Sequence, residues 1–258
     1  MITSLQNPRL KQVRALLERK RERYRQQAFV IEGARLLEEA LAARWPLRYI
    51  LYSADCTPRA RQAVDAAAQQ GVEIVQVGPR LLHAVSDVQT SQGVLAVASL
   101  QPLEIPAQLD FVLILDGLRD PGNLGTLLRT ALAAGVQAVF LPPGNADPFA
   151  PKVLRAGMGA QFGLPVVMLD WEALAQRLRR ENLKVLLADA AGAHIYTEED
   201  MTVPLALIIG GEADGAGARA RTLAQRTIRI PMPGSTESLN AAVAASILLF
   251  EVVRQRTV

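Results

Sequence analysis

Short apolar runs alternate along the chain with segments in which apolar residues recur at helical spacing. In the first hundred residues, the apolar runs bounded by turn residues predict four strands, over 28–33, 47–53, 72–77 and 93–100. The segments between them predict helices. A further helix is expected over 8–27, with the apolar stripe Leu10, Val13, Leu16 and Leu17. This alternation predicts a small α/β domain over residues 1–101.

The pattern changes at residues 102–109, where two prolines and no periodicity predict a linker. Beyond it, residues 110–258 predict a second domain with six apolar strands, over 110–116, 136–141, 164–168, 183–188, 204–209 and 226–230. Helical segments separate most of them, which predicts a parallel sheet covered on both faces. The last helix is expected over 238–255, with Ser238 as its N-cap. It is apolar on nearly every face, so it must be covered on more than one side.

Composition limits the class of protein. Half of the 258 residues are hydrophobic and there is one cysteine, which fits a globular protein of a reducing, cytoplasmic compartment. No stretch approaches the roughly 18 apolar residues of a membrane span. Residues 1–108 carry 14 Lys and Arg against 10 Asp and Glu, with much of the excess before residue 26. A basic segment of this kind favours a polyanion such as RNA as the partner, and the candidate contacts are Arg19, Lys20, Arg21 and Arg23.

Three polar motifs each follow an apolar run. They are Asn123-Leu-Gly-Thr-Leu-Leu-Arg129, Gly210-Gly-Glu-Ala-Asp-Gly215 and Ile230-Pro-Met-Pro-Gly-Ser-Thr-Glu-Ser-Leu-Asn240. Ligands in open α/β sheets bind beyond the carboxyl ends of the strands, so these motifs are the candidate site.

In this order, the motifs resemble those of the SpoU (TrmH) class of RNA ribose 2′-O-methyltransferases, which use S-adenosyl-L-methionine. The resemblance implies a C-terminal domain of the SPOUT type with a deep trefoil knot, a homodimer formed through that domain, and no metal. The first domain is similar to the substrate-binding domain of many members, which has a ribosomal-protein-like fold. As substrate, the resemblance favours rRNA over tRNA.

The same resemblance assigns the catalytic roles. Arg129 would activate the ribose hydroxyl, although a guanidinium scarcely loses its proton and is better suited to stabilise negative charge. Its apolar neighbours in the sequence indicate that it is buried. Asn123 would orient Arg129 or the ribose. Glu212 would shape the cofactor and phosphate site, and Ser238 and Asn240 would hydrogen-bond around it.

The cofactor is expected to meet the chain largely through backbone groups. The positions that match the family in this respect are Gly210, Ile230 and Leu239, with residues 188–190 nearby. His83 and His194 lie far from the motifs and are interpreted as incidental. No cluster with metal-ligand spacing is present in the sequence.

Two other classes of function predict different sequence features. A non-catalytic RNA-binding or ribosome-assembly protein would keep the fold, but the intact motif residues argue against it. A dinucleotide-dependent oxidoreductase requires G-x-G-x-x-G after the first strand, and residues 120–125 do not have that spacing.

Overall fold

The structure, a computed structural model, describes residues 1–212, 214–236 and 238–257. It divides into two compact units. Unit 1 comprises Met1–Gln101 and Phe149–Phe162, and unit 2 comprises Pro102–Pro148 and Gly163–Val258.

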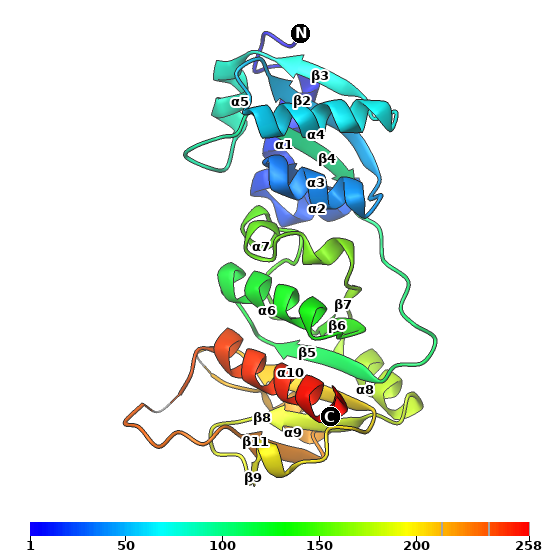
Figure 1. Cartoon of the computed structure of the whole chain (residues 1–258), viewed down its shortest axis with the longest axis vertical. Coiled ribbons are helices and arrows are strands. Elements are labelled where there is room, and N and C mark those ends of the chain that lie inside the picture. Colours follow the sequence, from blue (N-terminus) through cyan, green and yellow to red (C-terminus); the bar gives the residue numbers. More distant parts are fainter. Residues whose placement is uncertain (213, 237, 258) are drawn as a thin grey trace. The chain divides into compact units, whose positions relative to one another are not determined.

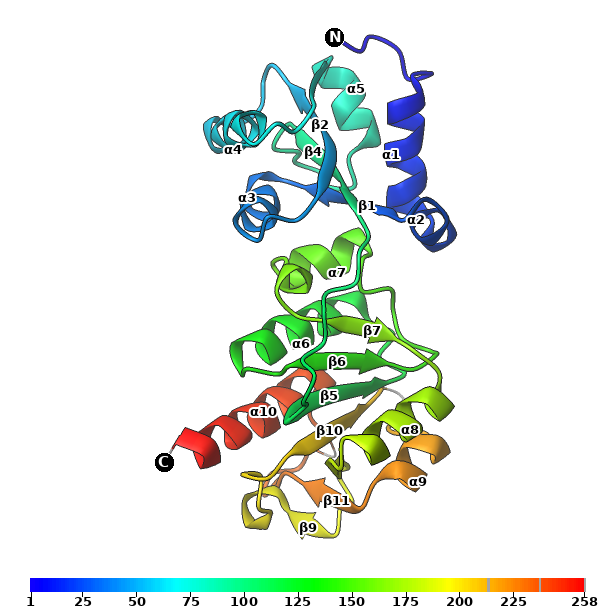
Figure 2. The same ribbon diagram turned by 90° about the vertical axis from the view of Figure 1, so that its right-hand side faces the viewer.

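Unit 1 has a four-stranded mixed sheet in the order β1-β4-β2-β3. Its elements are α1 (Pro8–Glu18), α2 (Lys20–Gln26), β1 (Ala28–Glu32), α3 (Ala34–Ala42), β2 (Leu47–Ser53), α4 (Pro58–Gln69), β3 (Ile74–Val77), α5 (Pro79–Val85), β4 (Val94–Ser99), α7 (Pro151–Ala156) and η1 (Ala160–Phe162). β4 pairs antiparallel with both β1 and β2, whereas β2 and β3 are parallel. Helices α1 and α5 lie on one side of the sheet, and α3 and α4 lie on the other (Figures 1 and 2).

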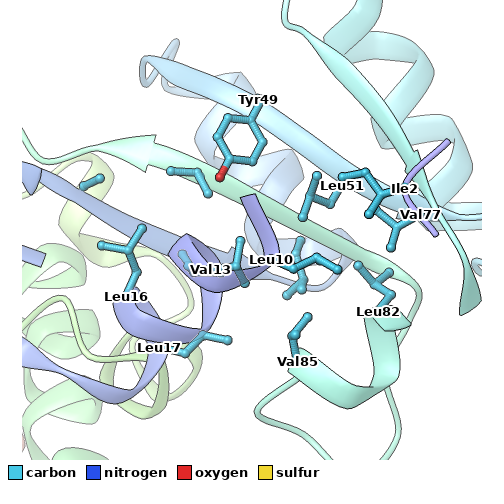
Figure 3. Close-up of a cluster of buried hydrophobic side chains, with 14 residues drawn as sticks. Ile2, Leu10, Val13, Leu16, Leu17, Tyr49, Leu51, Val77, Leu82 and Val85 are labelled. Atoms are coloured by element: carbon cyan, nitrogen blue, oxygen red, sulfur yellow. The ribbon is translucent and has the colours of Figure 1, made fainter. Parts of the chain in front are cut away.

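The predicted apolar stripe of the first helix is buried. Leu10, Val13, Leu16 and Leu17 all belong to one core cluster together with side chains of β2, β3 and α5. Figure 3 shows these side chains directed toward the sheet, beside Tyr49 and others. The apolar spacing of this segment therefore predicts correctly which of its side chains pack in the core.

The first helix is interrupted, however. The sequence predicts one helix over 8–27, but the backbone of Arg19 is extended (φ −122°, ψ 114°), so α1 and α2 are separate. Arg23 is only 4% exposed, and its Nη1 donates to the carbonyl oxygens of Leu16 (2.6 Å) and Leu17 (3.1 Å). These carbonyls belong to the last turn of α1, where helical partners are missing. The prediction that Arg23 contacts RNA is therefore wrong: its guanidinium is buried and binds the end of α1.

The segment 149–162 contributes aromatic side chains to unit 1. The ring centroids of Phe29 and Phe149 are 5.0 Å apart, and those of Trp45 and Phe162 are 5.3 Å apart. Arg155 adds an ion pair with Asp87 (2.7 Å).

Unit 2 has a seven-stranded sheet in the order β7-β6-β5-β10-β8-β11-β9. Its elements are β5 (Phe111–Asp116), α6 (Pro121–Ala133), β6 (Ala138–Leu141), β7 (Val166–Met168), α8 (Trp171–Arg180), β8 (Lys184–Ala188), β9 (His194–Ile195), η2 (Tyr196–Glu198), β10 (Leu205–Gly210), α9 (Ala218–Leu223), β11 (Arg226–Arg229) and α10 (Ala241–Thr257). Every adjacent pair of strands is parallel. The sheet is covered by α6 and α10 on one face and by α8 and α9 on the other (Figure 2).

The predicted parallel α/β architecture is thus confirmed, with one additional strand. β9 has only two residues, too few for an apolar run to be visible in the sequence. His194 lies in this strand.

The order of the sheet decides where the motifs meet. β10 lies between β5 and β8, with Gly210 opposite Asp116 and Ile209 opposite Ala188. Parallel strands end at the same edge, so the residues that follow these three strands are neighbours in space.

Replacing Arg23 tests its structural role. We expect Arg23→Ala to lower the free energy of unfolding of unit 1 by about 1–3 kcal/mol, because two carbonyls of α1 lose their buried donor. Urea unfolding followed by Trp45 fluorescence in a Trp171→Phe background reports unit 1 alone. The control is Arg21→Ala, at an exposed arginine of the same helix, which should change the stability little. Equal stability of the two variants would contradict the role of Arg23.

Candidate active site

Two glycines at the end of β10 let the chain pass close to its neighbours. A Cβ atom on Gly210 would lie 2.4 Å from the backbone nitrogen of Ala216, and one on Gly211 would lie 2.4 Å from the carbonyl oxygen of Gly117. No side chain fits at either position without moving backbone atoms. Asp116, at the end of β5, accepts a hydrogen bond from the amide of Gly217 (2.7 Å), which holds the far end of this turn.

The loop before α10 ends differently from the prediction. The helix begins at Ala241, and the cap is Asn240, whose Oδ1 accepts from the amides of Ala242 (2.8 Å) and Val243 (3.3 Å). The prediction that Ser238 caps this helix is wrong. Both residue types are good caps, and the sequence did not distinguish them.

Side chains from all three motifs are joined by hydrogen bonds. Nδ2 of Asn240 donates to Oδ1 of Asn123 (3.0 Å), and Nδ2 of Asn123 donates to Oε1 of Glu212 (2.9 Å). Asn123 lies in the first turn of α6, where its own amide donates to the cap residue Asp120 (2.8 Å).

This chain of hydrogen bonds has a direction. The Oδ1 of Asn240 faces backbone N–H groups, so its amide nitrogen is the group left to donate to Asn123. The oxygen of Asn123 is thereby the acceptor, and its nitrogen donates to Glu212. The carboxylate of Glu212 is the final acceptor in this series of hydrogen bonds.

A cavity of about 490 Å³ adjoins these hydrogen-bonded side chains. Its walls come from the ends of β8, β10 and β11, from the loop before α10 and from α10 itself. The predicted residues that line it are Gly210, Glu212, Ile230, Ser238, Leu239 and Asn240. Other lining residues are mostly apolar or small: Ala188, Ala190, Ile209, Gly211, Gly215, Ala216, Ile228, Met232, Ala241, Ala244 and Leu248.

Arg129 does not have the predicted environment. Its side chain is exposed, and it forms no hydrogen bond or ion pair with the residues that the structure describes. The prediction of a buried Arg129 relied on its apolar neighbours in the sequence. On a helix, however, residues three or four apart share a face, and Thr126 and Ala133 are exposed as well.

Two charged residues of the cavity were not predicted as individual site residues, although residues 188–190, which include Asp189, were expected near the cofactor. Asp189 directly follows β8, and its carboxylate forms an ion pair with Arg221 of α9 (2.6 Å). The backbone amide of Ala191 donates to Asp189 (2.9 Å), and these bonds lower the pKa of the Asp189 carboxyl despite its burial. The position of Asp189 just past a strand is a signal that the sequence offers, whereas nothing in the sequence marks Arg221.

The other candidates are not among the residues that line the cavity. Arg19, Lys20 and Arg21 are exposed on unit 1. Nε2 of His83 lies 3.9 Å from Oδ2 of Asp55, and Nδ1 of His194 lies 3.9 Å from Oε1 of Glu199. Within the described ranges, no three His, Cys, Asp or Glu side chains are grouped so that they could hold a metal ion. The described helices include none that is long and apolar enough to span a membrane.

Comparisons with known proteins agree with this geometry. Residues 110–250 match the SpoU rRNA Methylase family, and residues 7–96 match the MRM3-like substrate binding domain. The chain belongs to the SpoU rRNA methylase family. The resemblance inferred from the three motifs is confirmed.

The similar proteins extend over nearly the whole chain. The 23S rRNA (guanosine(2553)-2′-O)-methyltransferase RlmP of Bacillus subtilis (strain 168) is 34% identical, covering 97% of this chain and 98% of that protein. The 23S rRNA (guanosine-2′-O-)-methyltransferase RlmB of Escherichia coli (strain K12) is 34% identical, covering 95% and 96%. The solved structure of the SpoU methyltransferase AviRb from Streptomyces viridochromogenes, in complex with the cofactor AdoMet, has a TM-score of 0.86 at 32% identity and covers 97% of this chain and 99% of that one.

Substitution at Gly211 tests the close approach. We expect Gly211→Ala to lower the melting temperature of the protein, because the new methyl group would collide with the carbonyl oxygen of Gly117. Gly234→Ala is the control, since a Cβ atom there meets no atom of the described residues within 4 Å. If both variants melt at the wild-type temperature, the turn after β10 is not sterically constrained.

Proposed function

We propose that this protein transfers the methyl group of S-adenosyl-L-methionine to a ribose 2′-hydroxyl of RNA, with rRNA favoured over tRNA as the substrate. One observation carries the proposal most directly: Asn123, Glu212 and Asn240, from three separated motifs, are joined by hydrogen bonds at the edge of one cavity. Family membership supports it, and both relatives described above are named as 23S rRNA 2′-O-methyltransferases.

The cavity suits the cofactor. Apolar side chains such as Ile228, Ile230 and Leu248 supply surfaces for a purine ring, and the turn at Gly210 and Gly211 exposes backbone groups. Gly210, Ile230 and Leu239 are the proposed contacts through backbone atoms. The bound cofactor supplies an electrophilic methyl group on a sulfonium.

The protein must then align the ribose hydroxyl and stabilise the charge that develops on its oxygen. Alignment is the larger contribution, since positioning alone can remove about 7–11 kcal/mol of a barrier. Asn123 and Asn240 hold Glu212 in one orientation. Arg129, exposed on α6, is accessible to an RNA phosphate or ribose, where its guanidinium would stabilise negative charge. Ser238 lines the same cavity as a further hydrogen-bonding group.

Unit 1 is the proposed RNA-binding part, through the exposed residues Arg19, Lys20 and Arg21. The match of residues 7–96 to a substrate binding domain supports this assignment. We also propose a ribosomal-protein-like fold for this part and a cytoplasmic location for the protein.

A trefoil knot in unit 2 and a homodimer are also proposed. The return of the chain to the middle of the sheet at β10 is compatible with a knotted path. Val243 and Phe250 are each 49% exposed on α10, and Leu132 is 42% exposed on α6, so both helices present apolar side chains that a second copy would cover.

The alternative, a non-catalytic RNA-binding protein with the same fold, is disfavoured. A chain that had lost the reaction would have no reason to keep the three polar motif residues in one hydrogen-bonded arrangement beside the cavity.

Arg129→Ala tests the reaction and the site together. With methyl-labelled S-adenosyl-L-methionine and unmodified total RNA, the wild type should place label in a 2′-O-methylnucleoside. Arg129→Ala should lower the rate by about 100-fold or more, while cofactor binding and the melting temperature stay unchanged because the side chain is exposed. Arg219→Ala removes another exposed arginine of unit 2 as a control. Label on a base would refute the ribose assignment, and absence of both label and cofactor binding would favour the non-catalytic alternative.

Replacing Arg19, Lys20 and Arg21 by Gln tests RNA binding by unit 1. Each lost phosphate contact should reduce the slope of log K against log salt by about 0.7–0.9, so we expect weaker binding with a flatter salt dependence. Replacing Arg35, Arg59 and Arg61 by Gln removes the same charge from α3 and α4, on the other side of the sheet (Figure 2). If both triple variants change the slope equally, net charge rather than this surface explains the binding.

A further inference from the structure

Asp189 belongs to a second polar region of the cavity, separate from the motif residues. Glu212 follows β10 and bonds to Asn123 of α6, the helix that follows β5. Asp189 follows β8, on the other side of β10, and bonds to Arg221 of α9. Apolar lining residues make up most of the rest of the cavity. A ligand in the cavity therefore meets the Glu212 carboxylate beside the motifs and the Asp189 carboxylate beyond the end of β8.

The backbone that presents Asp189 is firmly held. Its amide donates to the carbonyl oxygen of Ile228 (2.9 Å), and its carbonyl accepts from the amide of Gly192 (2.9 Å). A Cβ atom on Gly192 would lie 2.6 Å from the carbonyl carbon of Ile228, so the loop packs directly on β11. Arg229 also donates to the carbonyl oxygen of Gly192 (2.6 Å). The carboxylate is therefore positioned before any ligand binds.

The Asp189 carboxylate keeps capacity for more bonds. One oxygen accepts from the amide of Ala191 (2.9 Å) and the other pairs with Arg221 (2.6 Å). A carboxylate has about four acceptor sites, so about two are left for donors of a ligand. Arg221 is itself fixed by a bond from its Nε to the carbonyl oxygen of Ala216 (3.1 Å).

The position of Asp189 matches a known solution for recognising ribose. In dinucleotide-binding sheets, a glycine-rich turn follows one strand, and the acidic residue that bonds to a ribose hydroxyl follows a strand close by in the sheet. Here the glycine-rich turn follows β10, and Asp189 follows the adjacent strand β8. The folds differ, and here the carboxylate precedes the turn in the chain, but in both cases the turn and the carboxylate follow neighbouring parallel strands.

From this geometry we infer that Asp189 accepts hydrogen bonds from the ribose hydroxyls of the cofactor's adenosine, and that Arg221 is a positioning residue that fixes the Asp189 carboxylate. The inference rests on the proposed function, because it concerns how the same cavity recognises its cofactor. Asp189, beyond the end of β8, would thus select the cofactor. Glu212 lies on the side of the cavity where the motifs meet.

The test combines a deletion in the protein with a deletion in the ligand. Titration calorimetry would use the full chain with S-adenosyl-L-homocysteine and with its 2′-deoxyribose and 3′-deoxyribose analogues. The wild type should bind the parent compound about ten- to hundredfold more tightly than at least one analogue, because a charge-assisted hydrogen bond is lost. Asp189→Ala should bind parent and analogues within about twofold of one another. Asp189→Asn, which keeps the size of the side chain, should discriminate less than the wild type.

Asp200 provides a matched control. It also accepts a hydrogen bond from the amide two residues later (Thr202, 2.9 Å), but it does not line the cavity. Asp200→Ala should keep the wild-type preference for ribose. A role of Asp189 in folding alone would weaken all three ligands by the same factor and leave the preference intact.

The outcomes separate this inference from the proposed function. If the wild type binds the parent compound but Asp189→Ala keeps its preference for ribose, the assignment of Asp189 is refuted and the function stands. Loss of all measurable binding in both Asp189 variants would make the residue structural and would also refute it. If the wild type binds none of the three ligands, the cofactor assignment fails, and the inference fails with it.

Discussion

The missing side chains of Gly210 and Gly211 are the constraint on which the site depends. β10 runs in the middle of the sheet between β5 and β8, and the turn after it passes against the backbone that follows β5, at Gly117, and against its own returning backbone at Ala216. Any side chain there would push the turn away from Gly117 and Ala216. With glycine, the turn stays close to the sheet, and Glu212 comes within hydrogen-bonding distance of Asn123. The cavity and the hydrogen-bonded side chains beside it both depend on this close approach.

Asn240 connects the stability of α10 to the chemistry of the site. Its side-chain oxygen serves the first turn of the helix and its nitrogen serves Asn123. Among the good cap residues, Asp could replace the oxygen but not the donor, and a Ser hydroxyl offers a single proton on a shorter side chain. The residue type is therefore set by two requirements at once, one structural and one for the orientation of Glu212.

Much of the fold and the candidate site could be predicted, because long apolar runs and three ordered motifs are strong signals. What failed depends on local geometry that periodicity does not contain. The break at Arg19 requires the guanidinium of Arg23 to bind carbonyls of the preceding turn, a contact invisible in the spacing of residues. Arg129 is exposed although its neighbours in the sequence are apolar, because burial on a helix depends on the face and not on adjacent residues. Asp189 is positioned by pairing with α9, which follows it by some thirty residues.

The assignment of Phe149–Phe162 to unit 1 has a consequence for how the protein can be divided. The chain passes between the two units at three junctions, after Gln101, Pro148 and Phe162. A protease that cuts once within residues 102–109 would detach Met1–Gln101 from the rest of the chain, but Phe149–Phe162 of unit 1 would stay covalently attached to unit 2. A gene fragment that encodes only the first 101 residues would produce unit 1 without Phe149 and Phe162, so Phe29 and Trp45 would lose these ring contacts. The boundary between the two matching families is thus not a boundary at which the protein separates into modules.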